Sequence, residues 1–286
     1  MFSKFVMPPT RQNEISTIEQ YMLDTLSNID IPKSILDIII HTGKRIRALL
    51  ALEIYYKYHK SIPDSLYKIL ALVELVHFAS LLHDDVIDNG IMRRGKSSMY
   101  QIYGAKKTIL LGDYLLAKIF SEITKLSIEK YIIDRFIKTA TSTAYGAYLE
   151  QHLLPSASLR DYIKMVSLKT SPLFQFASTA GLWYLDNIAK IGVYTTCFGI
   201  IYQVQNDLND YKQSVFQASE DYMQGNITYP FVVLRNKYSE LFINKNQQNF
   251  EHIQKLIHSE EFKQIAHSQL FPYLKRLTNS DVYIKW

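Results

Sequence analysis

LYKILALVELVHFASLLHDDVID, residues 66–88, is the most informative segment of the chain. Its apolar residues fall on every side of a helix rather than along one stripe, a pattern typical of a helix buried at the centre of a bundle. The segment ends in three carboxylates, those of Asp84, Asp85 and Asp88. We therefore predict a long buried helix with an acidic C-terminal end.

Apolar residues recur at helical spacing through most of the remaining chain. With the segment above, the predicted helices cover residues 34–58, 66–88, 105–126, 128–153, 158–180, 187–211, 229–238 and 249–276. The polar stretches 89–98 and 212–226 are predicted to be loops. No segment shows the sustained alternation that β hairpins require. The sequence thus predicts one all-α domain over residues 1–286, a bundle of long antiparallel helices.

Composition excludes several classes of protein. The 286 residues, 48% hydrophobic, are enough for a large core, and 10 glycines and 8 prolines are too few for a disordered or collagen-like chain. The net charge of +5 is mild, and the densest basic cluster is four residues long, which disfavours nucleic-acid binding. We find no uninterrupted apolar run of the roughly 18 residues that a membrane span needs. The single cysteine, Cys197, fits a reducing, cytoplasmic setting.

The acidic end of segment 66–88 points to a metal. Asp84 and Asp88 lie one helical turn apart on one face, with Asp85 beside them. Mutual repulsion, desolvation and the helix dipole all disfavour three carboxylates there, so a compensating cation is needed. Oxygen ligands of this kind suit Mg²⁺. The alternative is a solvated helix end whose carboxylates pair with nearby arginines.

A second acidic cluster closes the apolar stretch 191–204. Its Asp207 and Asp210 lie three residues apart and so share a helix face. Both acidic ends could face one deep apolar cavity. Divalent ions between them would then hold a diphosphate, and the cavity would hold the hydrocarbon tail of the same molecule.

Basic residues near these clusters would complete an anion site. Lys44 and Arg47 lie three apart on a predicted helix, while Arg93 and Arg94 follow the first cluster. Lys169 interrupts another apolar helix. Each alone is ordinarily a solvated surface group. A histidine such as His77 on an apolar helix is likewise more often a core residue, so only the combination indicates a site.

Four ordered motifs match one family. The longest is ELVHFASLLHDDVIDNGIMRRGKSSMYQIYGAKKTILLGDYLL, residues 74–116. The others are GKRIR at 43–47, LKTSPLF at 168–174 and GNITYP at 225–230. Through them the chain resembles the trans-isoprenyl diphosphate synthases, the polyprenyl synthetases, from about residue 43 to about residue 230.

The resemblance implies an isoprenoid synthase-like helical bundle around a deep apolar cavity, usually a homodimer, in which an allylic diphosphate is joined to isopentenyl diphosphate. It implies two or three Mg²⁺ ions held by Asp84, Asp85, Asp88, Asp207 and Asp210. The implied contacts of the allylic diphosphate are Arg93, Lys169, Thr170 and Gln203. Those implied for isopentenyl diphosphate are Lys44, Arg47, His77 and Arg94. Asp84, Asp85, Asp88, Lys169 and Asp207 form the implied catalytic set.

Three positions depart from the family pattern. Asn206 stands where the second motif usually begins with aspartate, Asn226 where a lysine is usual, and Ala147 where a GExxQ pattern has glutamate. These substitutions are compatible with three alternatives. The chain could be a slow enzyme, a weakly active or non-catalytic subunit of a heteromeric synthase, or a terpene cyclase or peptide prenyltransferase. The intact basic set for isopentenyl diphosphate argues against the last.

The residues before the first aspartate bear on product length. In short-chain members an aromatic residue near five positions before it blocks the cavity floor. Here Ala79 and Ser80 occupy those positions, with Phe78 one step further back. We therefore expect a medium or long all-trans prenyl diphosphate.

Overall fold

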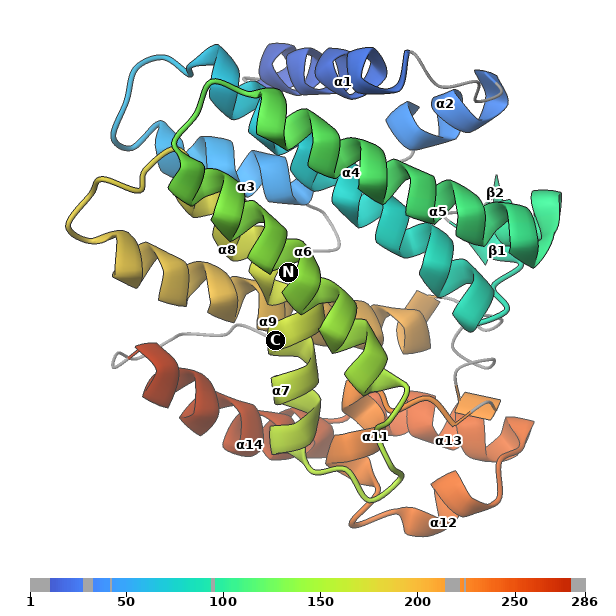
Figure 1. Cartoon of the computed structure of the whole chain (residues 1–286). Coiled ribbons are helices and arrows are strands. Elements are labelled where there is room, and N and C mark those ends of the chain that lie inside the picture. Colours follow the sequence, from blue (N-terminus) through green and yellow to red (C-terminus); the bar gives the residue numbers. More distant parts are fainter. Residues whose placement is uncertain are drawn as a thin grey trace. The chain divides into compact units, whose positions relative to one another are not determined.

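The computed structural model describes residues 11–27, 33–41, 43–93, 96–213, 222–223 and 225–278. Over these residues the chain is all-α except for one two-stranded ribbon (Figure 1). Contacts divide it into an N-terminal unit, with described residues of 11–141 and 176–188, and a C-terminal unit, with those of 142–175 and 189–278. The all-α prediction is confirmed, and the single domain stays a prediction.

The N-terminal unit is built around α4. Its elements are α1 (Gln12–Leu26), α2 (Lys33–His41), α3 (Ile46–Tyr55), α4 (Asp64–Ile87), β1 (Met92–Arg93), β2 (Lys96–Ser97), α5 (Met99–Lys125) and the first part of α6 (Lys130–Glu150). α4 packs against α1, α3 and α5. Every residue from Ile69 to Val76 is buried, as a helix that is apolar on all sides requires.

The helix α4 also bears on the membrane prediction. Within the described part of the chain it is the one helix long and apolar enough to cross a membrane, and 67% of its most apolar window is buried in the protein. The core helix of a globular protein has the same length and composition.

The N-terminal unit departs from the predicted elements at three points, and one predicted boundary agrees. The segment predicted as one helix, 34–58, forms α2 and α3, because the backbone of Arg45 is left-handed with φ 49°. α1 was not predicted. The regular part of α5 begins after Gly104, whose φ of 76° interrupts the helix, so the predicted start at 105 agrees. Part of the predicted loop is an antiparallel ribbon pairing Met92 with Ser97.

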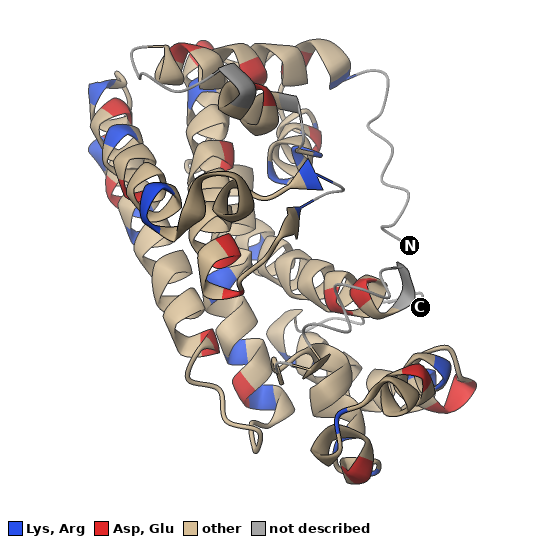
Figure 2. Cartoon of the chain, turned by 90° about the vertical axis from the view of Figure 1, so that its right-hand side faces the viewer, with Lys and Arg blue, Asp and Glu red and all other residues tan. Residues whose placement is uncertain are grey.

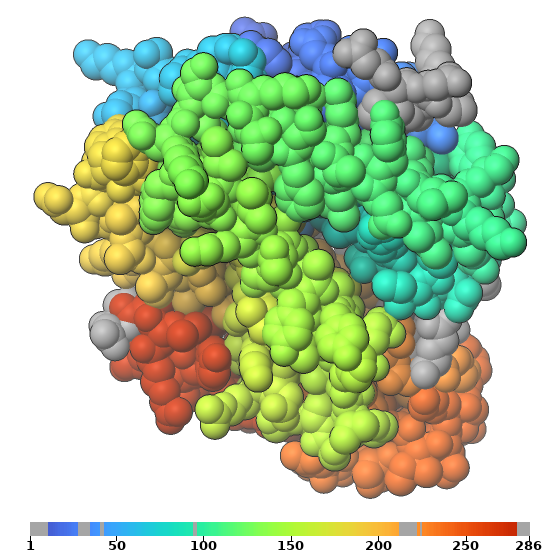
Figure 3. All heavy atoms as spheres, viewed as in Figure 1, coloured from blue at the N-terminus to red at the C-terminus, as the bar shows by residue number. Residues whose placement is uncertain are grey.

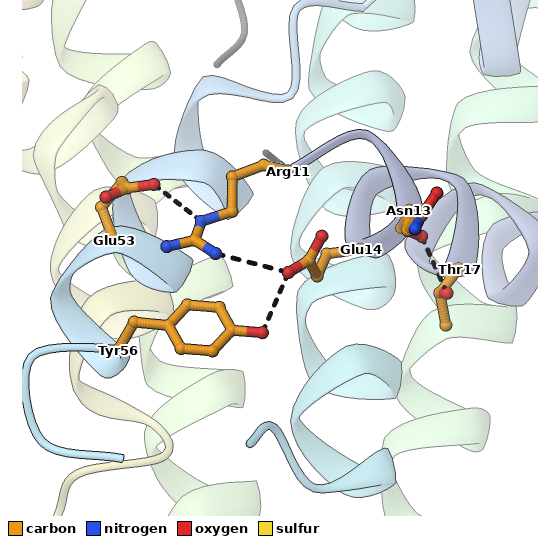
Figure 4. A network of polar contacts seen from close by, with 6 residues as sticks. All are labelled: Arg11, Asn13, Glu14, Thr17, Glu53 and Tyr56. Atoms are coloured by element: carbon orange, nitrogen blue, oxygen red, sulfur yellow. Dashed lines mark hydrogen bonds and ion pairs between the residues drawn. The ribbon is translucent and has the colours of Figure 1, made fainter. Parts of the chain in front are cut away.

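The N-terminal end of α1 is tied to α3 by a polar network. The Arg11 guanidinium donates to Glu53 from Nε (2.8 Å) and to Glu14 from Nη1 (3.5 Å), as Figure 4 shows. The Tyr56 hydroxyl donates to the same Glu14 oxygen at 2.9 Å, and its ring lies under the guanidinium. Burial, followed by the contact with Glu14, raises the pKa of Tyr56 to about 12.

The C-terminal unit packs around aromatic residues. Its elements are the end of α6, α7 (Leu159–Lys169), α8 (Ser171–Thr179, which enters the other unit at residue 176), α9 (Ile188–Gln213), α11 (Tyr229–Leu234), α12 (Ser239–Ile243), α13 (Gln247–Ile257) and α14 (Glu260–Thr278). α11 packs against α7 and α14. Tyr162, Tyr229 and Phe250 are almost fully buried in this core.

Two predicted helices of this region are each divided in two. The segment 158–180 forms α7 and α8, which meet at Thr170, and 249–276 forms α13 and α14. Ser158 starts α7 with a capping box: its hydroxyl accepts from the Asp161 amide, and Asp161 accepts from the Ser158 amide. Most of the predicted loop 212–226 lies outside the described residues.

Charges are mixed along the helices. Figure 2 shows Lys and Arg interspersed with Asp and Glu, and most of the drawn chain is uncharged.

Candidate active site

The three aspartates at the end of α4 differ in exposure. Asp84 is half-buried, Asp85 is 2% exposed, and Asp88, which caps the helix, is exposed. The chain leaves the helix through Asn89, whose φ of 50° is the left-handed conformation common after a helix end. Asp84 and Asp88 therefore offer carboxylates toward solvent, and Asp85 points into the protein.

The buried Asp85 is paired with Arg93 of the ribbon. Arg93 Nε donates to Asp85 Oδ1 at 2.5 Å, and the arginine side chain is 31% exposed. Burial raises the pKa of Asp85, Arg93 counteracts that effect, and the neighbouring Asp84 adds to it. The ion pair thus fixes Arg93 beside the two accessible carboxylates, with part of its guanidinium in reach of a ligand.

The residues predicted for isopentenyl diphosphate lie at the start of α3 and on α4. Lys44 is exposed, whereas Arg47, in the first turn of α3, is 7% exposed. The buried Glu74 of α4 accepts a hydrogen bond from the Ala48 amide at 3.1 Å, which fastens the start of α3 to α4. His77 follows Glu74 by one helical turn. Arg94 lies outside the described residues.

In the C-terminal unit, Asp207 is the centre of a polar network. Its side chain is 7% exposed and accepts from the Tyr162 hydroxyl (2.7 Å), the Tyr229 amide (2.8 Å) and Gln203 Nε2 (2.8 Å). Burial raises the pKa of Asp207 to about 6, although each of these hydrogen bonds favours the charged form. Gln203 in turn accepts from the Thr170 hydroxyl at 3.1 Å. The structure therefore brings the predicted residues Thr170, Gln203 and Asp207 together.

Lys169 is held beside this network. Its ammonium forms an ion pair with Glu150 of α6. α6 and α7 cross so closely that a Cβ on Gly146 would lie 2.1 Å from the Lys169 backbone nitrogen, so only glycine fits there. The motif GAYLE thus keeps the glycine that the crossing needs, and its last residue pairs with a predicted substrate contact.

The predicted metal ligands belong to both units: Asp84, Asp85 and Asp88 to one, and Asp207 and Asp210 to the other. Among the residues that the structure describes, no three His, Cys, Asp or Glu side chains lie close enough to hold one metal ion. Asp84 and Asp88 share a helix face and offer carboxylate oxygens, the donors that Mg²⁺ prefers, so this pair fits the ion chemically. Asp85 Oδ1 accepts from Arg93, and both side-chain oxygens of Asp207 accept from protein donors.

A cavity of about 590 Å³ lies in the C-terminal unit. Phe231 and Phe242 line it together with Arg235 and Lys245. None of the predicted site residues lines it. The predicted cavity beside both acidic clusters involves residues of both units and stays a prediction.

Sequence analysis missed Tyr162. It is one of 21 tyrosines, and nothing in its neighbourhood along the chain marks it. Its hydroxyl meets Asp207 across 45 positions of sequence, and burial with the nearby Asp207 charge raises its pKa well above 10. A tertiary contact of this kind leaves no local pattern that a reader of the sequence could find.

The polyprenyl synthetase family profile matches residues 30–267. This covers most of the 286 residues, so the chain belongs to the polyprenyl synthetase family.

Named relatives make prenyl diphosphates of different lengths. Geranylfarnesyl diphosphate synthase of Methanosarcina mazei is 29% identical over 241 residues, which cover 82% of this chain and 80% of that protein. Geranylgeranyl pyrophosphate synthase 3, chloroplastic, of Arabidopsis thaliana is 28% identical over 214 residues, 67% of this chain. The chain spans 59% of that plant protein's length.

Solved structures share the fold. The polyprenyl synthase of Caulobacter crescentus, complexed with calcium and isoprenyl diphosphate, aligns with a TM-score of 0.80 at 23% identity, covering 94% of this chain and 87% of that one. The geranylgeranyl pyrophosphate synthase of Lactobacillus brevis aligns with a TM-score of 0.78 at 19% identity, covering 97% of this chain and 92% of that one. The fold is therefore the all-α isoprenoid synthase fold.

Proposed function

We propose that the protein is a metal-dependent prenyltransferase that joins an allylic diphosphate to isopentenyl diphosphate. One observation carries this proposal: two accessible carboxylates, Asp84 and Asp88, share a face at the end of a buried helix, with Arg93 fixed beside them by Asp85. Acidic groups that hold cations and a neighbouring arginine suit a diphosphate. Membership of the polyprenyl synthetase family supports the same conclusion.

In this proposal the metal is Mg²⁺, and two or three ions bind. Asp84, Asp88 and Asp210 would be among its ligands, and the neutral oxygen of Asn206 would add a weaker one. When bound, Mg²⁺ neutralises the charge that develops on diphosphate as it leaves the allylic carbon. Asp85 and Asp207 would complete the set of ligands. Asp85 Oδ1 also orients Arg93, and both oxygens of Asp207 also accept hydrogen bonds from the protein.

The chain's own cations complete the binding of the two substrates. Arg93 and Lys169 bind the allylic diphosphate, and each is oriented by a carboxylate, Asp85 and Glu150 respectively. Thr170 and Gln203 extend that site. Lys44, Arg47, His77 and Arg94 bind isopentenyl diphosphate. Apolar walls would keep water from the allylic cation, since water would otherwise capture it.

The product is, in this proposal, a medium or long all-trans prenyl diphosphate. Ala79 and Ser80 are small, so they leave the path below the first aspartate open to a growing chain. Phe78 is 9% exposed and sits in the packed core of its unit, which supports the view that it does not close that path.

We further propose a homodimer in a reducing, cytoplasmic compartment. The helix α5 exposes large apolar side chains, those of Ile102, Ile109, Leu110 and Tyr114. In Figure 3 the green atoms of α5 lie on the near face of the molecule. Exposed apolar residues gathered on one element are typical of an interaction surface.

Incubation of the purified protein with Mg²⁺, isopentenyl diphosphate and an allylic primer, either farnesyl or geranylgeranyl diphosphate, tests the function. We expect elongated products by mass spectrometry, and none after chelation with EDTA. Asp84→Ala is expected to lower kcat by about 100-fold or more, whereas Asp134→Ala, an exposed aspartate of α6, leaves it unchanged. Failure to elongate any primer would overturn the proposal.

The same assay separates the alternative of a heteromeric subunit, which Asn206 favours because it removes one charge from the second cluster. A chain that elongates primers alone excludes an obligatory partner. An inactive chain that gains activity on adding a second synthase subunit would support the alternative instead.

A further inference from the structure

Arg45, in the GKRIR motif between α2 and α3, has an unusual conformation. Its φ of 49° is left-handed, which is uncommon for a residue with a side chain, and the residue is only 4% exposed. Its guanidinium lies against Gly43, where a Cβ would come within 2.3 Å of Nη1. A buried charge in a strained backbone needs strong contacts to hold it there.

Two other helices supply those contacts. Arg45 Nη2 donates to the carbonyls of Ile39 (2.8 Å) and Ile40, in the last turn of α2. Those carbonyls have no partner within the helix and carry the negative end of its dipole. Arg45 Nε donates to Glu19 of α1 at 3.2 Å. One guanidinium therefore joins α1, the end of α2 and the start of α3.

This arrangement decides where the neighbouring cations lie. Lys44 precedes the left-handed residue and is exposed, while Arg47 follows it by two positions in the first turn of α3 and is buried. Glu74 of α4 secures the same segment from the other side through the Ala48 amide. Without the bond to Glu19, the guanidinium would lose the carboxylate that balances its charge, and the backbone at Arg45 would relax.

We propose that Glu19 is a positioning residue for the isopentenyl diphosphate site and acts through Arg45. This inference rests on the proposed function, in which Lys44 and Arg47 bind that diphosphate. Glu19 touches neither substrate. It sets the spacing of the two cations, so its loss weakens the binding of one substrate and leaves the other substrate's site intact.

The test is the KM of each substrate in Glu19→Gln, which keeps the size of the side chain and removes its charge. The matched control is Glu53→Gln, which breaks the Arg11–Glu53 ion pair of Figure 4, also between the α1 region and α3 but away from the motif. We expect the KM for isopentenyl diphosphate to rise about 5- to 10-fold in Glu19→Gln, with kcat and the KM of the allylic primer unchanged. The control should change neither KM.

A second variant keeps the experiment decisive. Arg45→Lys retains the charge but cannot reach two carbonyls and a carboxylate at once, so it should raise the same KM without abolishing folding, which circular dichroism checks. If the wild-type chain is active and both variants match the control, the inference is wrong and the proposed function stands. If the wild-type chain neither turns over nor binds isopentenyl diphosphate in calorimetry, both are wrong.

Discussion

Asp85 and Arg93 form an ion pair in which the carboxylate is almost fully buried and the guanidinium is partly exposed, with Nε and Oδ1 2.5 Å apart. The cation offsets the desolvation of the buried carboxylate, and the exposed guanidinium can still meet a ligand. Lys169 is likewise paired with a carboxylate, that of Glu150, although there both partners are partly exposed. In each case an acid of one element orients a cation of another.

Removal of Arg93 should therefore destabilise the protein as well as its site. Arg93→Ala leaves the Asp85 carboxylate buried without its cation, and we expect the free energy of unfolding to fall by about 2 kcal/mol. The double variant Asp85→Asn, Arg93→Ala should recover most of that loss, because the buried charge is gone. Urea unfolding of the wild type, of Arg93→Ala and of the double variant measures the two losses, and equal losses in the single and double variants would contradict the expectation.

Tyr162→Phe is expected to weaken the C-terminal unit. The phenyl ring preserves packing, but Asp207 loses one of its three donors in a buried setting, at a cost of about 2 kcal/mol in unfolding free energy. Tyr148→Phe is the control, since that ring is 59% exposed and its change should alter stability by less than about 0.5 kcal/mol. Thermal unfolding of both variants measures the two changes in stability. Equal changes in Tyr162→Phe and Tyr148→Phe would contradict the expectation.

Leu110→Glu is expected to convert a dimer into monomers. Leu110 is 67% exposed on α5, one turn before Tyr114, so a charge there would be buried in an interface formed by this helix face. Sedimentation velocity measures the outcome. Lys164→Glu, at an exposed lysine of α7, should leave the oligomeric state unaltered. A wild-type chain that is monomeric at all concentrations would contradict the homodimer.

The thiol of Cys197 should be inert in the native protein. The residue is 3% exposed, and burial raises the pKa of its thiol to about 11. At pH 8 only about one thousandth would be thiolate, against about a quarter for an ordinary thiol, and the thiolate fraction rises about tenfold per pH unit up to pH 10. Ellman's reagent should react slowly with the native chain and fully in urea. Val193→Cys, at a half-exposed site on α9, supplies a reactive control.

The helix α4 was predictable because its burial is encoded locally. A helix with apolar residues on all sides is unstable at the protein surface and is therefore buried. The carboxylates at its end show where it reaches the surface. The start of a helix at residue 105 was likewise predictable. The backbone of Gly104 is not helical, so the regular part of α5 begins after it.

The break between α2 and α3 was not predictable by the same reasoning. The apolar spacing from Ile35 to Leu50 continues through it, so the pattern favours one helix. The chain turns there because Arg45 finds Glu19 and two carbonyls, which are contacts from other elements. For an arginine a positive φ is strained, and contacts of this kind compensate the strain.

The roles of the aspartates divide in the same way. Spacing along a helix is a local property, so the sequence alone determined that Asp84, Asp85 and Asp88 gather at one helix end and that a cation belongs near them. Burial and partners are not local. Only the tertiary structure decided that Asp85 binds Arg93 and that Asp207 is held by Tyr162 and Tyr229, because those partners arrive from segments whose positions no neighbouring residue encodes.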